Sequence, residues 1–166
     1  MDALSEILKS ISLRGAVFYN AEFSAPWSFR SPPSCALARR LSLEAEHVIV
    51  YHMIGEGQAW VQLDGGSRVE LGSGDIVMFP GGDSHLMGSG GTSTPVDLGA
   101  ELERIVAQGL ETARMGGGGA ATKFICGYLA CDPELSRCVL AGLPRVLKVN
   151  IRNDPAGAWL ENSIRF

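Results

Sequence analysis

The strongest constraint on the fold is the regular interruption of short apolar segments by turn residues between positions 58 and 87. Gly, Pro, Asp and Ser fill the interruptions, and the whole chain contains 21 glycines among its 166 residues. This is nearly double the average glycine content of about 7%. Short strands at even spacing are typical of a β-sandwich or barrel. The sequence predicts four of them here: Gln58–Leu63, Arg68–Leu71, Ile76–Phe79 and His85–Met87.

The rest of the chain adds further strands and helices to this β-rich centre. Alternating or apolar segments predict strands at Ala16–Phe23, Cys35–Leu43, His47–Ile54 and Lys123–Leu129, and Val146–Ile151 is a further apolar stretch.

Helices are predicted where apolar residues recur at helical spacing or where a start signal stands. Spacing predicts a short helix over 2–11 and an amphipathic one over 98–110. Asp132-Pro133 and Asp154-Pro155 each begin a further helix, because Asp caps a helix and Pro suits its first turn. A Gly-rich insert, about 88–120, has the composition of a mobile flap.

Length and charge narrow the class of protein. A chain of 166 residues fits one domain, and a chain of this size buries roughly 70% of its unfolded surface without needing metal or disulfides. The net charge is −4 and the pI about 5.3, whereas a DNA-binding domain carries a basic patch or a pI above about 9. The chain has no apolar run of the roughly 20 residues that span a membrane, and its first ten residues lack the basic end and apolar stretch expected of a secretory signal. We therefore expect a cytoplasmic protein with reduced cysteines, no membrane contact and, by itself, no nucleic-acid contact.

Residues 74–85 contain the most specific short motif. Gly74 is followed by five residues, then Pro80, one residue, Gly82, two residues and His85. This spacing resembles the second motif of the cupins. Gly74 would turn the chain into a short buried strand, Pro80 and Gly82 would turn it back, and His85 would point into a barrel.

The first cupin motif, which holds three of the four usual metal ligands, is not matched. Setting Gly57 as its last glycine places Val50 where the motif has Glu, and Glu44 and Glu46 where it has two His. A catalytic metal needs about three protein ligands and an open position. The mismatch argues against a metal-dependent cupin oxygenase or isomerase.

His52 is the second candidate for the barrel interior. By two-residue alternation it shares a face with Val48 and Val50, which the cupin alignment turns inward. One interpretation is a core or rim imidazole hydrogen-bonded to backbone. The other is a pocket residue, or a metal ligand, opposite His85.

Two cysteines are candidate ligands for the same metal site. Cys126, in a predicted strand, would join His52 and His85 in a zinc site, with Cys131 as a fourth ligand, since imidazole and thiolate suit zinc. Zinc or another divalent metal is thus a candidate cofactor. The alternative is that Cys126 is simply a small buried hydrophobe.

The remaining tryptophan, cysteine and histidine residues are predicted to be mainly structural. Trp27 and Trp60 are most simply core, although aromatic walls also line small-molecule pockets, so both join His52 and His85 as candidate ligand-binding residues. Cys35 and Cys138 are predicted to lie in the core, and His47 on the surface.

The order of short motifs over nearly the whole chain resembles the N-terminal effector domain of AraC-type transcriptional regulators. The segments that carry this resemblance are Asp2-Ala3-Leu4-Ser5, Arg14-Gly15-Ala16-Val17-Phe18, Ala25-Pro26-Trp27, His52 through Trp60, Gly74 through His85, Cys126-Gly127-Tyr128 and Leu143-Pro144-Arg145-Val146-Leu147. The resemblance implies a mostly β, cupin-like double-stranded β-helix (jelly-roll) barrel with a short N-terminal helix and C-terminal helices.

The same resemblance implies a function and a domain plan. Residues 1–152 would form a sensor domain that binds a small-molecule effector, and 153–166 would begin an interdomain linker helix. We expect a homodimer that is not an enzyme and that reaches DNA only through a C-terminal domain absent from this chain. The alternatives are a small metal-dependent cupin enzyme and a pure dimerisation domain with a filled barrel.

Overall fold

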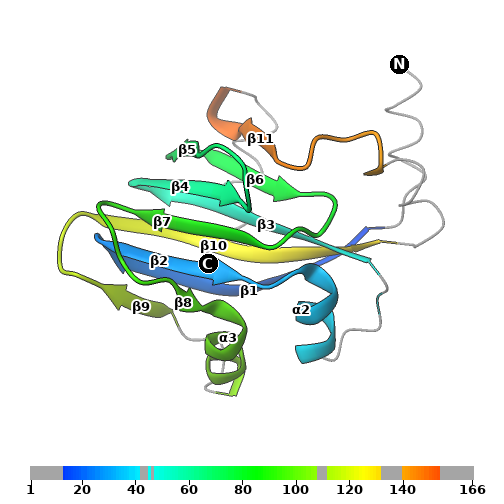
Figure 1. Ribbon diagram of the computed structural model, residues 1–166, viewed down its shortest axis with the longest axis horizontal. Coiled ribbons are helices and arrows are strands. Elements are labelled where there is room, and N and C mark those ends of the chain that lie inside the picture. The colour runs from blue at the N-terminus through cyan, green and yellow to red at the C-terminus, as the bar shows by residue number, and fades with distance from the viewer. Residues whose placement is uncertain (1–12, 42–44, 46, 108–111, 132–139, 154–166) are drawn as a thin grey trace.

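Two β-sheets packed face to face dominate the computed structural model, which describes residues 13–41, 45, 47–107, 112–131 and 140–153 (Figure 1). The strands of the larger sheet are β1 (Leu13–Ser24), β3 (His47–Glu56), β6 (Asp75–Phe79), β9 (Ala113–Gly116), β10 (Ala121–Cys131) and β11 (Leu147–Asn150). Those of the smaller sheet are β2 (Trp27–Ser31), β4 (Gln58–Leu63), β5 (Val69–Gly72), β7 (His85–Ser89) and β8 (Val96–Asp97). The helices are α2 (Ser34–Arg40), α3 (Leu98–Ala107) and the 3₁₀ helix η1 (Ile151–Asn153).

The strand order places sequence-distant segments side by side. It is β11-β6-β3-β10-β1-β9 in the six-stranded sheet and β5-β4-β7-β2-β8 in the five-stranded sheet. All neighbouring pairs are antiparallel except β1–β9 and β2–β8. The prediction of a mostly β, cupin-like jelly roll is confirmed.

Alternation along the strands fills the space between the sheets. In β4, for example, Ala59, Val61 and Leu63 are buried, whereas Trp60 and Gln62 between them are half-buried. Both sheets contribute aromatic side chains to this interior, and the largest that are at most 3% exposed are Tyr19, Phe23, Trp27, Phe29, Phe79 and Phe124. The barrel is therefore packed at its centre with rings.

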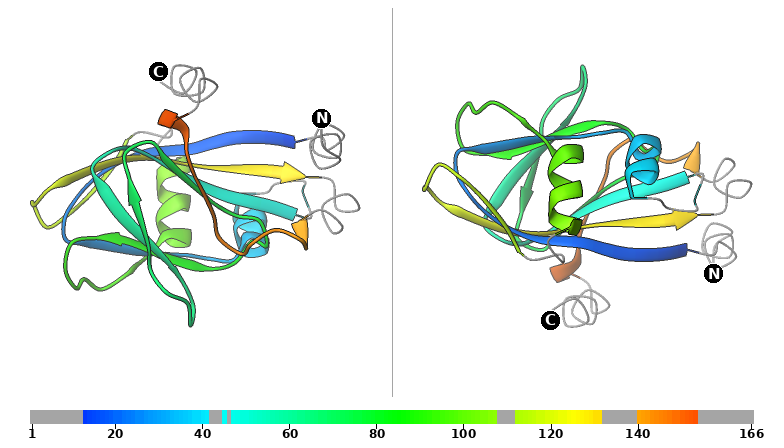
Figure 2. Two further views of the ribbon diagram at one scale, coloured as in Figure 1. Left: turned by 90° about the horizontal axis from the view of Figure 1, so that it is seen from above. Right: turned by 90° about the horizontal axis from the view of Figure 1, so that it is seen from below.

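The Gly-rich insert contributes to the same core. Leu98, Leu102 and Ile105 lie on one face of α3, are at most 4% exposed, and belong to the interior cluster. The two helices lie on the same side of the sheets (Figures 1 and 2), where Arg40 of α2 and Glu103 of α3 form an ion pair at 3.4 Å. The described part of the insert is thus anchored by apolar contacts.

One predicted strand is wrong. The pattern of Cys35–Leu43 predicts an extended segment, but helix α2 begins at Ser34 directly after Pro33, which is its N-cap. The segment is rich in Ala, Leu and Arg, which favour helix, and its apolar residues fit either periodicity. Cys35 is exposed rather than in the core. Strand β2, which contains Trp27, is not among the predicted strands.

Several predictions concern residues outside the described ranges. The helix over 2–11 and the helices starting at Asp132 and Asp154 fall there, as does Cys138. No helix within the described ranges is long and apolar enough to cross a bilayer.

The turn geometry predicted for residues 74–85 is present. Gly74 and Gly82 have φ of 88° and 69°, and β6 lies between them. A Cβ on Gly82 would lie 2.0 Å from the Ser34 Oγ and 2.9 Å from the Ser34 Cβ, so the turn packs closely on the start of α2. Both the backbone angle and the close approach require glycine at position 82.

We predict that Gly82→Ala lowers the free energy of unfolding by more than Gly65→Ala. Gly65 has a similar φ of 72° but no atom within 4 Å of an added Cβ, so its substitution reports the backbone cost alone, about 1 kcal/mol. Gly82→Ala adds the steric conflict with Ser34, about 1 kcal/mol or more. Urea unfolding of both variants measures the difference. Equal losses would show that the approach of Ser34 does not constrain this turn.

Candidate functional site

The three residues predicted to share a site meet in the middle of the barrel. His52 on β3 and Cys126 on β10 are directly opposite each other in the antiparallel register of the six-stranded sheet. His85 reaches them from β7 of the other sheet. All three are 0% exposed, so the cluster links the two sheets at the centre of the core.

Their contacts form a chain. The His52 Nδ1 lies 2.6 Å from the Cys126 Sγ, and the His52 Nε2 lies 2.8 Å from the His85 Nε2. The His85 Nδ1 lies 3.2 Å from the backbone carbonyl oxygen of Asp83. Because a carbonyl can only accept, the His85 Nδ1 donates to Asp83. The His85 Nε2 then accepts from the His52 Nε2, and the His52 Nδ1 accepts the thiol proton of Cys126.

Each member of this chain is held uncharged. Burial lowers the pKa of His85 to about 4, although the hydrogen bond to the Asp83 carbonyl and the nearby Asp83 charge oppose the shift. Burial, and then the neighbouring His85, hold the pKa of His52 well below its usual range. Burial likewise raises the pKa of the Cys126 thiol far above its ordinary value. At neutral pH the chain is therefore a neutral relay of donors and acceptors.

Aromatic rings enclose the imidazoles. Phe79 stacks on His85 with 3.6 Å between ring centroids, and Phe29 and Phe124 contact His52 edge-on at 5.8 and 6.4 Å. Trp27 stacks on Phe29 and Phe124 one layer further out, at 5.9 and 5.4 Å. His52, His85 and Trp27 thus share one interior.

Trp60 does not share that interior. It lies on the opposite face of β4 from the buried Val61, and the Arg68 guanidinium stacks over its ring at 3.9 Å. Alternation along β4 places its side chain on the outer side of the five-stranded sheet. His47, predicted to be exposed, is half-buried with its Nε2 2.7 Å from the carbonyl oxygen of Pro80.

Tyr19 is an interior residue that the sequence reasoning did not select. It is 2% exposed and lies beside Cys126, and burial together with that neighbour raises the pKa of its hydroxyl. Within the barrel interior, and among the described residues, the Tyr19 hydroxyl and the Trp27 Nε1 are buried without a well-aligned hydrogen-bond acceptor, since the Cys126 sulfur beside Tyr19 is a weak acceptor. The signal available was alternation, because Tyr19 shares a strand face with Ala21 and Phe23.

Asp83 connects the relay to the C-terminal part of the chain. Its carbonyl accepts from His85, and its carboxylate pairs with Arg145 at 2.5 Å. Arg145 stands two residues before β11. The interior chain therefore ends on a residue that also holds the segment leading to β11.

Zinc at the predicted site would need ligands that converge on one point. His52 directs its two nitrogens at two different partners, so the three side chains do not converge. Two imidazoles on one tetrahedral zinc would have their nitrogens about 3.3 Å apart, against 2.8 Å here. The described residues contain no group of three or more His, Cys, Asp or Glu arranged to hold a metal ion.

Cys131 is remote from the same cluster. Its backbone is five residues along β10 from Cys126, about 16 Å at the strand rise, and it pairs with His47. One zinc ion cannot bridge that separation. As they lie, the residues do not fit a metal, and zinc at His52, His85 and Cys126 stays a prediction that elemental analysis of the purified protein would test.

Comparisons with known proteins define the class. A family model described as Cupin matches residues 2–166, so the chain belongs to the cupin family. The predicted resemblance, to the cupin domain at the N-terminus of AraC-type regulators, is confirmed at this level.

Individual relatives are distant. The HTH-type transcriptional regulator AlkR of Acinetobacter baylyi is 27% identical over 97 residues, which cover 58% of this chain and 28% of AlkR. The chain thus spans less than a third of that relative. Among solved structures, YhaK of Escherichia coli aligns with 87% of this chain and 52% of its own at 10% identity and a TM-score of 0.44. The alignment with ToxT of Vibrio cholerae covers 93% of this chain and 48% of ToxT, at 12% identity and a TM-score of 0.45.

We predict that the protein loses stability as the pH falls from 7.5 to 5. The pKa of His85 is about 4 in the fold, so the unfolded chain, with its ordinary value near 6.5, takes up more protons below pH 6.5. The contribution of His85 is complete above pH 6.5 and falls by about 2 kcal/mol at pH 5. His52, whose pKa is shifted in the same direction, adds to this loss. Urea unfolding at pH 7.5, 6 and 5 measures it.

His85→Gln serves as the test variant, because an amide can still donate and accept but does not titrate. We expect it to reduce the slope of stability against pH. Val61→Ala is the control, because it removes buried apolar atoms from the same core but no titratable group, and it should keep the wild-type slope. A wild-type slope in His85→Gln would contradict the neutral relay.

We also predict that Cys35 and Cys126 differ sharply in reactivity. Cys35 is exposed on α2, whereas Cys126 is 0% exposed and its raised thiol pKa leaves little thiolate. Iodoacetamide should modify Cys126 at least about a hundredfold more slowly than Cys35, because Cys126 reacts only after the barrel opens. Peptide mass spectrometry over time measures both rates. Similar rates would mean that the interior is open to solvent.

Proposed function

We propose that this chain is the effector-sensing and dimerisation domain of an AraC-type transcription regulator, and that it acts on DNA through a domain outside this chain. Residues 1–152 would be the sensor and 153–166 the beginning of the linker helix. The proposed role is not enzymatic, and the proposed protein is a cytoplasmic homodimer. The match to the cupin family over residues 2–166 supports this assignment, and the relative AlkR is an HTH-type transcriptional regulator.

The observation that carries the effector proposal is the pair of unpaired donors inside the barrel. A buried hydroxyl or indole N–H without a partner costs about 1–3 kcal/mol. Tyr19 and Trp27 both hold such donors, in a core where aromatic and aliphatic side chains surround the two imidazoles. An effector with an apolar body and an acceptor oxygen for each donor would satisfy them, with His52 and His85 beside it.

Entry to this core would pass α3. Its buried residues complete the interior cluster, and they are contributed by the insert rather than by a barrel strand. We propose that α3 withdraws Leu98, Leu102 and Ile105 when the effector binds. An effector that binds this opened state more tightly would shift the population toward it, which only differential affinity can do.

The response would leave the barrel through Asp83. An effector that competes for His85 alters the hydrogen bond to the Asp83 carbonyl, and Asp83 holds Arg145 by its carboxylate. Movement there would be passed to β11 and to the residues that follow. This supports a route from the interior to the proposed linker made of two adjacent contacts.

Tyr19→Phe tests the effector proposal. We expect the free energy of unfolding of the unliganded variant to be unchanged or higher, because the substitution removes an unpaired buried hydroxyl. Small molecules that carry an acceptor oxygen, selected by their ability to raise the Tm of the wild type, should bind the variant about tenfold more weakly.

Tyr51→Phe is the matched control, since Tyr51 alternates with His52 and faces away from the interior. It should keep wild-type affinity for the same compounds. Compounds that bind Tyr19→Phe as tightly as the wild type would refute an effector site at these donors. A strict monomer in sedimentation at micromolar concentration would refute the dimer.

A further inference from the structure

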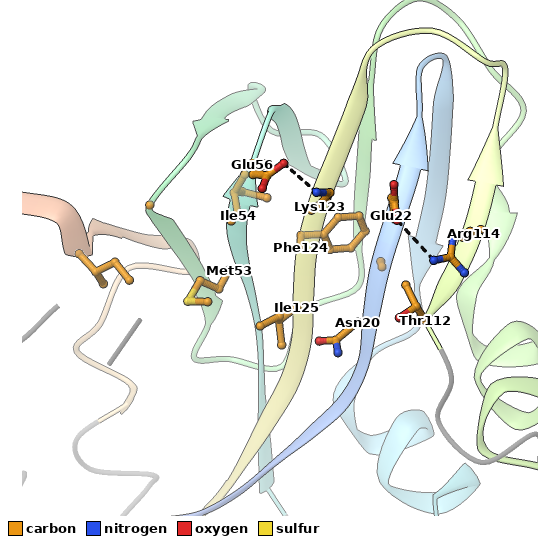
Figure 3. Close-up of a pocket in the computed structure, with 14 residues that line it drawn as sticks. Asn20, Glu22, Met53, Ile54, Glu56, Thr112, Arg114, Lys123, Phe124 and Ile125 are labelled. Atoms are coloured by element: carbon orange, nitrogen blue, oxygen red, sulfur yellow. Dashed lines mark ion pairs between the residues drawn. The ribbon is translucent and has the colours of Figure 1, made fainter. Parts of the chain in front are cut away.

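The outer face of the six-stranded sheet has an apolar cluster separate from the barrel interior. Met53 of β3, Ile76 of β6 and Ile151 of η1 are at most 8% exposed and pack together, with Ile125 of β10 against them. Beside them lies a groove of about 460 Å³ (Figure 3). This groove is distinct from the His52–His85–Cys126 cluster, which lies between the sheets.

The groove crosses the sheet. It runs from Gly74, at the start of β6, over β3, β10 and β1 to Arg114 on β9. Met53 and Ile125 form its apolar floor, as the close-up shows. Exposed ion pairs stand along its rim: Glu56–Lys123 at 3.0 Å and Glu22–Arg114 at 3.5 Å. An apolar floor between charged rims suits an amphipathic segment that keeps its polar side in water.

The chain itself reaches this groove at Ile151, directly after β11. Ile151 lines the groove, and its N–H donates to the Gly74 carbonyl oxygen at 2.9 Å. Residues 154–166 follow directly after η1, which ends at Asn153, and they begin with the helix-start pair Asp154-Pro155. In a helix, Ala156, Leu160 and Ile164 would share one face with Trp159 next to them.

The width of the groove across the strands agrees with the length of residues 154–166 as a helix. Five strands from β6 to β9 are separated by four spacings, about 19 Å in all. The 13 residues 154–166 would span about 20 Å as a helix. Residues 1–12 are a poorer occupant, because they join β1 at Leu13. Leu13 lies eight residues, about 26 Å, from the Ala21 position that lines the groove.

We propose that the groove on the outer face of the six-stranded sheet is the docking site for residues 154–166 of the same chain, with Trp159 placed over Met53 and Ile125. The docked segment would lie across the strands that carry His52 and Cys126 on their other face. This inference does not depend on an effector and holds for any function of the domain.

Methyl NMR of the full chain labelled at methionine tests the proposal. The ring of Trp159 should displace the Met53 methyl signal, which Met53→Leu assigns. Trp159→Leu keeps an apolar side chain but removes the ring, so the Met53 signal should shift while that of Met87, inside the barrel, stays in place. Trp60→Leu, the same change on the outer face of the other sheet, is the matched control and should leave Met53 unmoved.

Two outcomes would overturn the proposal. An unchanged Met53 signal in Trp159→Leu would show that Trp159 does not lie in the groove. A Met53 signal that shifts with protein concentration would show that a second copy, rather than the same chain, supplies the occupant.

A variant on the groove side gives an independent readout. Ile125→Asp places a charge on the apolar floor and should release the segment, so that chymotrypsin cleaves after Trp159 about fivefold faster or more. The Ile125→Val variant should be cleaved at the wild-type rate. Equal cleavage rates in Ile125→Asp and the wild type would contradict docking.

Discussion

The complete burial of two imidazoles between the sheets is the constraint on which the rest of the barrel depends. A charge on His52 or His85 would be too costly in that interior, so both rings must be neutral and each nitrogen needs a partner of the right kind. The chain from Cys126 through His52 and His85 to the Asp83 carbonyl meets that requirement with one direction of donation. It also fixes how the two sheets face each other, because its members come from both.

Local patterns predicted much of the fold but not which residues meet. Turn residues placed β4 to β7 within about two residues, and alternation turned His52 inward. The contact of His52 with Cys126 depends on pairing between strands 74 residues apart, which no local pattern encodes. Alternation along β4 also places Trp60 on the outer face of its sheet, because its neighbour Val61 faces the interior. The helix at Ser34–Arg40 was missed because its short apolar pattern fits both periodicities.

The two sheets differ in a way that the sequence already contains. β4 alternates buried with half-buried or exposed residues, as expected of a sheet with one covered face, whereas β3 has the largely apolar sequence HVIVYHMIGE and buries adjacent residues such as Ile49 and Val50. A near-continuous apolar strand is expected where both faces are covered. Tyr51 and Met53 lie on the face of β3 opposite to His52, and that outer face already carries Ile151 from η1. The sequence of β3 thus agrees with a second layer over this sheet.

The segment 74–85 connects the two faces of the larger sheet. At its beginning, the Gly74 carbonyl accepts from Ile151, and the Asp75 carboxylate accepts from Asn150 and pairs with Lys148, both on β11. At its end, the Asp83 carbonyl oxygen accepts the hydrogen bond from His85, and the Asp83 carboxylate pairs with Arg145. Both ends of the cupin motif therefore hold the C-terminal segment, on either side of β11. A displacement of His85 inside the barrel would act on the same short loop-and-strand unit that positions the chain where it enters the outer groove, so the interior and the outer face are mechanically joined through β6.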